Sequence, residues 1–463
     1  MSTPILWILI PLFFAGLGLF FTRYPLVLKW SAVGIGSLLS LSASLLPINE
    51  PFRLLFWEIV LSDQLLVFGR RFVISGVDRP IVVLIFGVYL FWSLIQNPKN
   101  VPAYFSPLSL AGITLIITAY AVDPIFYGAL FFAFLALLHV VMLSPPGGDP
   151  TPGVMRLLIY QILGMLFILF AAWLASWVGF NRGDQLMLSR SLVILALGFS
   201  FLLAIFPFIS WIPMVAEKNH PFISGFIFNV YFLGVFLFGS RFLMEGGWFA
   251  QGINLQAPLQ FAGVMMLVFG GVLAVFTHHL GRISAALVIS EIGRSLLGFS
   301  LFRLGFPIYF AMFMIQTIAL GNWSTSLTNL RSGLPEVDVR TAAGAGRQWP
   351  LISSGLIFSY FTLAGLPLLA GFPLYLALGN GLKAYPAWIN GVLILGSLGL
   401  IIGGLRSFSV LMEDSGEESP LDLGDRFDKV VILALNLVLL LLGLFPQVVY
   451  QVAQLITDLM MGT

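Results

Sequence analysis

Ile205-Phe-Pro-Phe-Ile-Ser-Trp-Ile-Pro213 is an apolar stretch with two prolines six residues apart, and Gly365-Leu-Pro-Leu-Leu-Ala-Gly-Phe-Pro373 repeats that spacing. A proline inside a helix removes one backbone hydrogen bond and clashes with the preceding turn. In membrane proteins, helices interrupted at corresponding points in the two halves of the chain usually indicate a transport pathway built from internal repeats. We therefore predict two broken membrane helices. The interrupting prolines are Pro207, Pro213, Pro367 and Pro373.

The composition around these stretches is that of a membrane protein. The chain has 59% hydrophobic and only 9% charged residues, whereas soluble domains have roughly a quarter charged. Apolar runs of about 17 to 25 residues are long enough to cross a bilayer as helices. We predict an all-α polytopic protein with about fourteen transmembrane spans. They lie near 4–22, 26–46, 80–97, 104–121, 124–143, 155–180, 188–213, 221–240, 258–278, 282–301, 305–323, 351–379, 386–405 and 430–456.

Several kinds of site are disfavoured by the residues themselves. The chain has no cysteine, so disulfides, thiolate metal sites and iron–sulfur ligation are excluded. We expect no cofactor in this chain, with redox chemistry left to partner proteins. His278 and His279 lack further candidate ligands, so no metal site is expected. The net charge of +2 and the scattered basic residues argue against nucleic acid as a partner.

The order of spans suggests an internal duplication. The longest polar segments are 47–79, 324–350 and 407–428, so no soluble domain is expected. We predict that 324–350 is a connection leading into the second broken helix. Two repeats of five spans, about 104–240 and 258–405, would each contain one broken helix. Because five is odd, the repeats would be inverted relative to the membrane. The first span is predicted to be a retained helix rather than a signal peptide, and the lysine and arginine bias places both termini outside.

Four ordered motifs resemble one family. The run Phe206–Glu217 is similar to the "FPFHxWLPDAxxxAP" signature of the antiporter-like membrane subunits of complex I, the proton-pumping NADH:quinone oxidoreductase. Leu280–Gly293 is similar to the "LKRxLAYSSISQIGY" stretch of that family, and Leu363–Phe372 to its "LAGIPPxxGFxGK" broken helix. Gly69–Asp78 resembles its early "GxxxxVDxLS" segment. The resemblance implies a single antiporter-like transmembrane domain over residues 1–463, of the smaller or middle-member type.

The departures from the family pattern concern its charges. Members carry ionisable side chains halfway across the membrane, because a proton needs stepping sites whose charge can change. The glutamate expected in the fifth span falls on Ala133, and the lysine before the first broken helix falls on Leu202. The lysine of the eighth span falls on Tyr231, and the charged residue after "GFxG" falls on Tyr375. The expected relay charges are missing at all four positions.

Ionisable residues that remain give the candidate sites. Glu291 and Arg294 are three residues apart on one helical face, where they could be a surviving piece of a hydrophilic axis or a structural ion pair. His139 could titrate near neutral pH, or could be a satisfied core or interfacial histidine. Glu217 and Lys218 follow the first broken helix, at the edge of an ion path or in a solvated loop. The proton-path candidates are Glu291, Arg294, His139, Glu217, Lys218, Tyr231 and Tyr375.

The resemblance implies a membrane-arm subunit of a complex I-like assembly that transfers electrons from NADH, or another donor, to quinone and translocates protons. It implies as partners other membrane-arm and redox subunits, lipid, and quinone elsewhere in the complex. An energy-transducing membrane, such as the bacterial plasma membrane, is the expected location. Either this chain passes protons along a rewired path, or it is a degenerate copy that keeps the fold without pumping. The alternative is a subunit of a cation/proton antiporter, membrane-bound hydrogenase or bicarbonate-uptake assembly, since one fold serves several functions.

Overall fold

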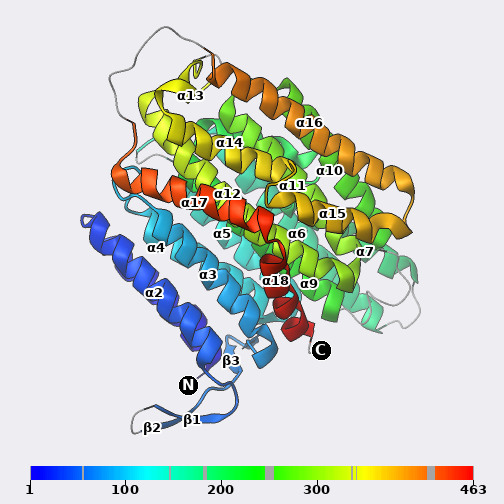
Figure 1. Cartoon of the computed structure of the whole chain (residues 1–463). Helices are drawn as coiled ribbons and strands as arrows, with labels where there is room; N and C mark the ends of the chain where they lie inside the picture. The colour runs from blue at the N-terminus through cyan, green and yellow to red at the C-terminus, as the bar shows by residue number, and fades with distance from the viewer. Residues whose placement is uncertain are drawn as a thin grey trace.

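The computed structural model describes residues 2–54, 57–144, 147–180, 185–245, 255–334, 337–339, 341–413 and 423–461. Within these residues, ten helices are long and apolar enough to cross a membrane. The chain is an integral multi-pass membrane protein, and its predicted helical class is confirmed. Its long helices lie side by side, with α2 at one edge of the bundle and α16 at the opposite edge (Figure 1). The predicted number of fourteen spans and the inverted repeats stay predictions.

The described residues of the first half of the chain form nine α-helices. They are α1 (Ile10–Phe20), α2 (Pro25–Leu45), α3 (Arg79–Ile95), α4 (Phe105–Ala121), α5 (Gly128–Leu143), α6 (Pro152–Phe180), α7 (Gln185–Leu202), α8 (Trp211–Lys218) and α9 (Pro221–Glu245). The second half forms nine more. They are α10 (Gln256–Phe276), α11 (Leu280–Ser300), α12 (Gly305–Gly333), α13 (Ala345–Gln348), α14 (Pro350–Ala364), α15 (Gly371–Gly381), α16 (Ala387–Leu411), α17 (Arg426–Leu444) and α18 (Gln447–Met461).

Short strands at one end of the bundle add to the helical fold. They are β1 (Pro51–Leu54), β2 (Trp57–Val60), β3 (Gln64–Val67), β4 (Arg70–Val73) and β5 (Val122–Asp123). Two antiparallel hairpins result, and β5 pairs with β4 after a long excursion through α3 and α4. An ion pair of 2.8 Å between Arg71 and Asp123 joins the same two strands. Strands β1 to β4 lie in the predicted polar segment 47–79 and β5 follows α4, and none of the five was predicted.

The buried centre of the bundle is made by α9, α11 and α12. In their most apolar stretches, 94%, 100% and 83% of residues are buried, against 28% in α6 and α17. Helices α6 and α17 keep an exposed apolar face, as expected for contact with lipid. A helix that is buried all round must satisfy its polar side chains internally, because no water is available in a bilayer. Functional side chains are therefore to be sought around these three central helices.

Two predicted boundaries are wrong. Helix α12 continues to Gly333, so the segment 324–350 is not a single polar connection. Its polar side chains are accommodated because several bond their own helix, as Thr325 does to the carbonyl of Gly321 at 2.9 Å. The predicted span 430–456 is two helices, α17 and α18, with Pro446 between them. A proline has no amide hydrogen to continue the helical ladder, and the sequence signal was present but overlooked.

A buried carboxylate ties the last third of the chain to the first. Asp428 in α17 is 1% exposed, and its Oδ2 accepts hydrogen bonds from Asn97 Nδ2 at 2.9 Å and Asn100 Nδ2 at 2.8 Å. Asn100 also donates to Asn329 Oδ1 on α12 at 3.1 Å. The connection between α3 and α4 is thereby bound to both α12 and α17.

Candidate functional site

Both predicted broken helices are present. In the first, α7 ends at Leu202 and α8 begins at Trp211. In the second, α14 ends at Ala364 and α15 begins at Gly371. The links between the halves are not α-helical, so each break exposes backbone groups inside the membrane domain. Such groups need partners from neighbouring helices.

The prolines explain the form of each break. Pro213 and Pro373 are each the third residue of the second half-helix, where the amide would have no intrahelical acceptor. Pro207 and Pro367 lie in the non-helical links. In a continuous helix the amide of residue 367 would donate to the carbonyl of Leu363, but proline has no amide hydrogen. The carbonyl of Leu363 is therefore free to accept from side chains.

Side chains from three other helix segments gather at this carbonyl. Arg294 Nη1 donates to Leu363 O at 2.8 Å, and Tyr375 Oη lies 3.0 Å from the same oxygen. Tyr375 Oη also lies 2.5 Å from Glu291 Oε1, and Arg294 forms an ion pair with Glu291. Arg294 Nη2 donates to Ser397 Oγ at 3.1 Å, and its guanidinium stacks on the Tyr375 ring. We call these residues the Glu291 cluster.

The Glu291 cluster is a compensated ion pair rather than an isolated acid. Glu291 is 2% exposed and Arg294 is fully buried. An arginine keeps its charge in proteins, and a buried ion pair is stable only when its remaining hydrogen-bonding groups are also satisfied. Tyr375, Leu363 and Ser397 supply most of those bonds, while Arg294 Nε has no partner among the described residues. The cluster thus holds α11 against the second break and against α16.

Among the described residues, no ion pair of this kind lies at the first break. Tyr231 Oη donates to the carbonyl of Leu202, the last residue of α7, at 2.9 Å. The ring of His139 packs edge-on to the ring of Tyr231, with centroids 5.8 Å apart. His139 is 1% exposed, and its Nδ1 has no partner among the described residues. His139 thus lies in the core without being fully hydrogen-bonded, and its part in a proton path stays a prediction.

Replacing Tyr231 with phenylalanine is expected to reduce the free energy of unfolding by about 1–3 kcal/mol, because the carbonyl of Leu202 loses its donor. Thermal unfolding of the detergent-purified protein measures this loss. Tyr24, which is 62% exposed, gives the matched control, and its change to phenylalanine should have little effect. Equal stability of both variants would contradict the role assigned to the Tyr231 hydroxyl.

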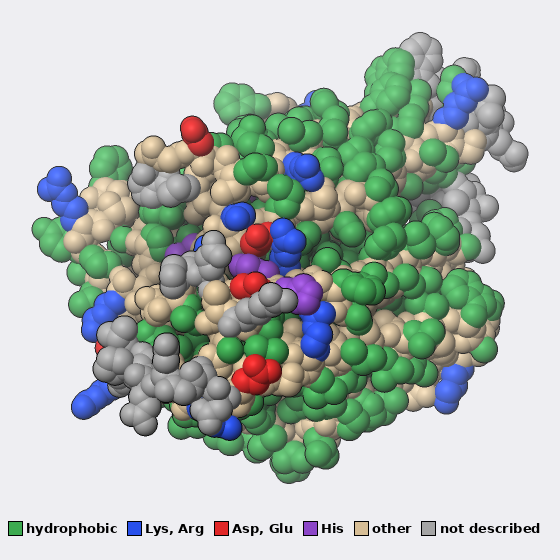
Figure 2. Space-filling view, turned by 90° about the horizontal axis from the view of Figure 1, so that it is seen from above, with side chains coloured by type: hydrophobic (Ala, Val, Ile, Leu, Met, Phe, Trp, Pro, Cys, Tyr) green, Lys and Arg blue, Asp and Glu red, His purple; other side chains and the backbone are tan. Residues whose placement is uncertain are grey.

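Glu217 and Lys218 lie at the end of α8, near the surface. Glu217 Oε2 lies 2.6 Å from Arg282 Nε, and Lys218 Nζ lies 3.6 Å from Glu217 Oε1. Burial tends to raise the pKa of Glu217, but the hydrogen bond and charge of Arg282 outweigh it, so this pKa lies below its usual range. Seen from the end where α13 lies, acidic, basic and histidine side chains gather near the centre of the face (Figure 2).

The seven predicted residues therefore fall into separate groups. Glu291, Arg294 and Tyr375 form one cluster. His139 and Tyr231 form a second group, and Glu217 and Lys218 a third. Within the part of the chain that the structure describes, no hydrogen bond joins one group to another. Sequence reasoning missed Ser397 and the carbonyl of Leu363, although the proline four residues after Leu363 was the signal for the latter.

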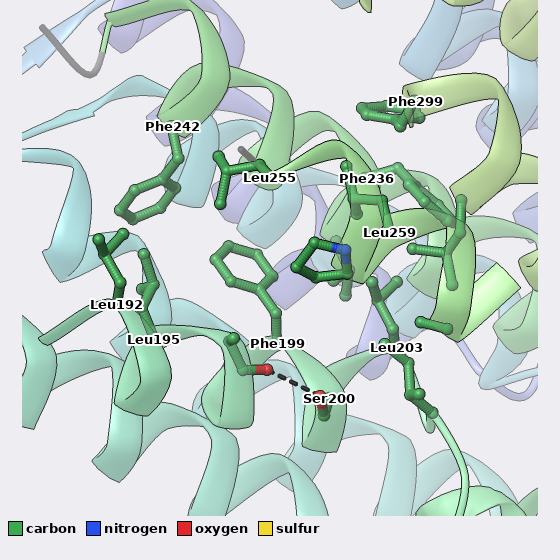
Figure 3. A pocket seen from close by; sticks show the side chains of 17 residues that line it. Leu192, Leu195, Phe199, Ser200, Leu203, Phe236, Phe242, Leu255, Leu259 and Phe299 are labelled. Carbon is green, nitrogen blue, oxygen red and sulfur yellow. Dashed lines mark hydrogen bonds between the residues drawn. The ribbon is translucent and has the colours of Figure 1, made fainter. Parts of the chain in front are cut away.

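An apolar cavity lies beside the first break. It has a volume of about 200 Å³ and is lined by residues of α7, α9, α10 and α11, together with link residues such as Leu203 and Leu255 (Figure 3). Ser200 is the only polar side chain among these lining residues, and its hydroxyl donates to the carbonyl of Ala196 at 2.7 Å. This side of the first break therefore offers neither a charge nor a free hydrogen-bonding side chain in the cavity wall.

The fold is shared with solved membrane complexes. A chain of the archaeal membrane-bound sulfane sulfur reductase matches with a TM-score of 0.76 at 16% identity, covering 100% of this chain and 98% of that one. A chain of the Mrp complex from Dietzia matches with a TM-score of 0.75 at 14% identity, covering 99% and 97%. A chain of Thermus thermophilus respiratory complex I matches with a TM-score of 0.73 at 20% identity, covering 98% and 99%. The chain has the antiporter-like fold.

Sequence comparison confirms the resemblance of this antiporter-like chain to subunits of complex I. The NADH-quinone oxidoreductase subunit N of Methylovorus glucosotrophus is 29% identical over 298 residues, which cover 63% of this chain and 60% of that protein. Its counterpart from Ectopseudomonas mendocina is 24% identical over 319 residues, covering 63% of each. The match thus spans about three fifths of the length of these relatives. No family model matches the chain.

Proposed function

We propose that this antiporter-like chain is a membrane-arm subunit of a complex I-like assembly in a bacterial respiratory membrane. The assembly would couple electron transfer to quinone with proton translocation, and redox subunits other than this chain would hold the cofactors. The similarity to NADH-quinone oxidoreductase subunit N supports this assignment over the other functions of the fold. The likeness to the Mrp complex is in fold alone.

Within that assembly, the chain fills a structural place and passes no protons through itself. The main support for this proposal is the set of side chains that lie at the two helix breaks. At the first, Tyr231 and Leu202 lie where the family resemblance implies lysines, and the Tyr231 hydroxyl donates to a carbonyl. At the second, Arg294 neutralises Glu291. A proton path needs side chains that can change charge in sequence, and the separated groups do not supply one.

The partner set is tested by purifying the tagged chain from its native membrane in gentle detergent and identifying co-purifying proteins by mass spectrometry. We expect quinone-reductase and iron–sulfur subunits. Recovery with cation/proton antiporter subunits instead would overturn the assignment to a complex I-like assembly.

The non-pumping role is tested by changing Glu291 to glutamine in the assembled complex. The ratio of protons translocated to electrons transferred, measured in sealed vesicles, should not change. Because the single change leaves Arg294 buried without its partner, the double variant Glu291→Gln, Arg294→Met provides a neutral second test. Loss of proton translocation with assembly and electron transfer intact would show that the chain does pump.

A further inference from the structure

A small cavity lies where α8, α9, α11 and α12 meet. It leaves about 10 Å³ open to the centre of a water molecule, and one buried water needs about 10–15 Å³ measured in this way. The cavity is separate from the two breaks and from the apolar cavity described above. Its size suits one small polar molecule and no larger ligand.

Three residues of its wall each carry a buried polar atom without a partner. Ser224 Oγ on α9, Ser324 Oγ on α12 and Trp323 Nε1 on α12 form no hydrogen bond with any described residue. Their residues are 2%, 0% and 2% exposed, respectively. Buried polar atoms in native proteins are nearly always satisfied, by protein or by ordered water. Three of them lining one cavity match the roughly three hydrogen bonds that a buried water makes.

Gly225 keeps this space polar and close-packed. A Cβ atom at this position would lie 1.9 Å from Ser324 Oγ, so the Ser324 hydroxyl rests directly against the α9 backbone. A larger residue at position 225 would displace that hydroxyl. The glycine therefore fixes the position of the Ser324 oxygen, on α12, relative to Ser224, which precedes Gly225 on α9.

The rest of the cavity wall offers little further hydrogen bonding. Ser284, near the start of α11, already donates to the carbonyl of Gly281 at 2.6 Å. The side chains of Phe228 and Leu320 are apolar. The three unpartnered groups are therefore the main polar contacts available to a molecule in the cavity.

We propose that this cavity is a water-binding site. One water molecule accepts a hydrogen bond from Trp323 Nε1 and donates to Ser224 and Ser324. The apolar side chains of Phe228 and Leu320 give it no further partner. The site joins α9 to α12 through the water, and it does not depend on which assembly contains the chain.

Hydroxyl-radical labelling with short X-ray pulses tests the site in the full chain within native-membrane vesicles, because radicals form from bound water beside a buried residue. Trp323 should be oxidised about fivefold faster than Trp7, since an ordered water lies beside one indole alone. Trp7 is a suitable reference, because it is fully buried and its indole donates to Ser42.

Ser224→Val fills the cavity and removes one hydroxyl, and it should lower Trp323 oxidation to the rate of Trp7. The matched control is Ser240→Val on the same helix, where the hydroxyl donates to Leu237 O at 2.7 Å; it should leave Trp323 oxidation unchanged. If Ser224→Val does not fold, Ala216→Val fills the cavity from α8. Equal oxidation of Trp323 and Trp7 in the unaltered chain, or unchanged Trp323 oxidation in a cavity-filling variant, overturns the proposal.

Discussion

Replacing Arg294 with methionine is expected to lower the free energy of unfolding by about 3–5 kcal/mol, because Glu291 is left as a buried carboxylate without its cation. The carbonyl of Leu363 and the hydroxyl of Ser397 lose a donor in the same change. Thermal unfolding of the detergent-purified protein and its yield in the membrane measure the effect.

The double variant Glu291→Gln, Arg294→Met should recover most of that loss, since a buried ion pair can often be replaced by neutral side chains at little cost. Arg282→Met is the matched control. It removes the partner of Glu217, but the Arg282 side chain is 50% exposed, so the expected cost is about 1 kcal/mol or less. If the double variant is as unstable as Arg294→Met, the loss does not come from an unpaired charge.

Changing Gly371 to alanine should destabilise the protein by about 3 kcal/mol, because the added methyl group has no room. A Cβ at this position would lie 2.0 Å from the carbonyl oxygen of Thr362. That oxygen belongs to the backbone of α14, so it cannot rotate away as a flexible side chain would. The second half-helix would have to move away from the first, and with it Tyr375.

Gly391 in α16 provides the control for this change. No atom lies within 4 Å of a Cβ built there, and alanine should stabilise the helix by about 0.5–1 kcal/mol relative to glycine. Thermal unfolding of both variants distinguishes crowding at the break from a general effect of alanine. A stable Gly371→Ala protein would mean that the packing of the two half-helices is looser than the structure shows.

Local chemistry made the breaks and the ion pair predictable from the sequence. The prolines act within one turn of the chain, and Glu291 and Arg294 meet because residues three apart share a helix face. The carbonyl that Arg294 and Tyr375 contact follows from the same proline rule. Which side chains contact this carbonyl could not be derived, because α11, α14 and α15 are brought together only by tertiary packing.

Two features could not be predicted from the sequence: a contact between distant residues, and the continuation of α12 through polar residues. Asp428 and Asn97 are 331 residues apart, and nothing in the sequence pairs them. The polar residues at the end of α12 lowered the local hydropathy and predicted a connection after residue 323. In the structure they stay helical, because hydroxyls such as those of Thr325 and Thr328 bond carbonyls four residues earlier.

The buried carboxylate of Asp428 has a consequence for biogenesis. Its amide partners, Asn97 and Asn100, are synthesised more than 300 residues before it. Before α17 packs against the α3–α4 connection, Asp428 lacks these two donors, and a carboxylate near the bilayer is unfavourable without partners. The start of α17 therefore joins the α3–α4 connection only after most of the chain has been made.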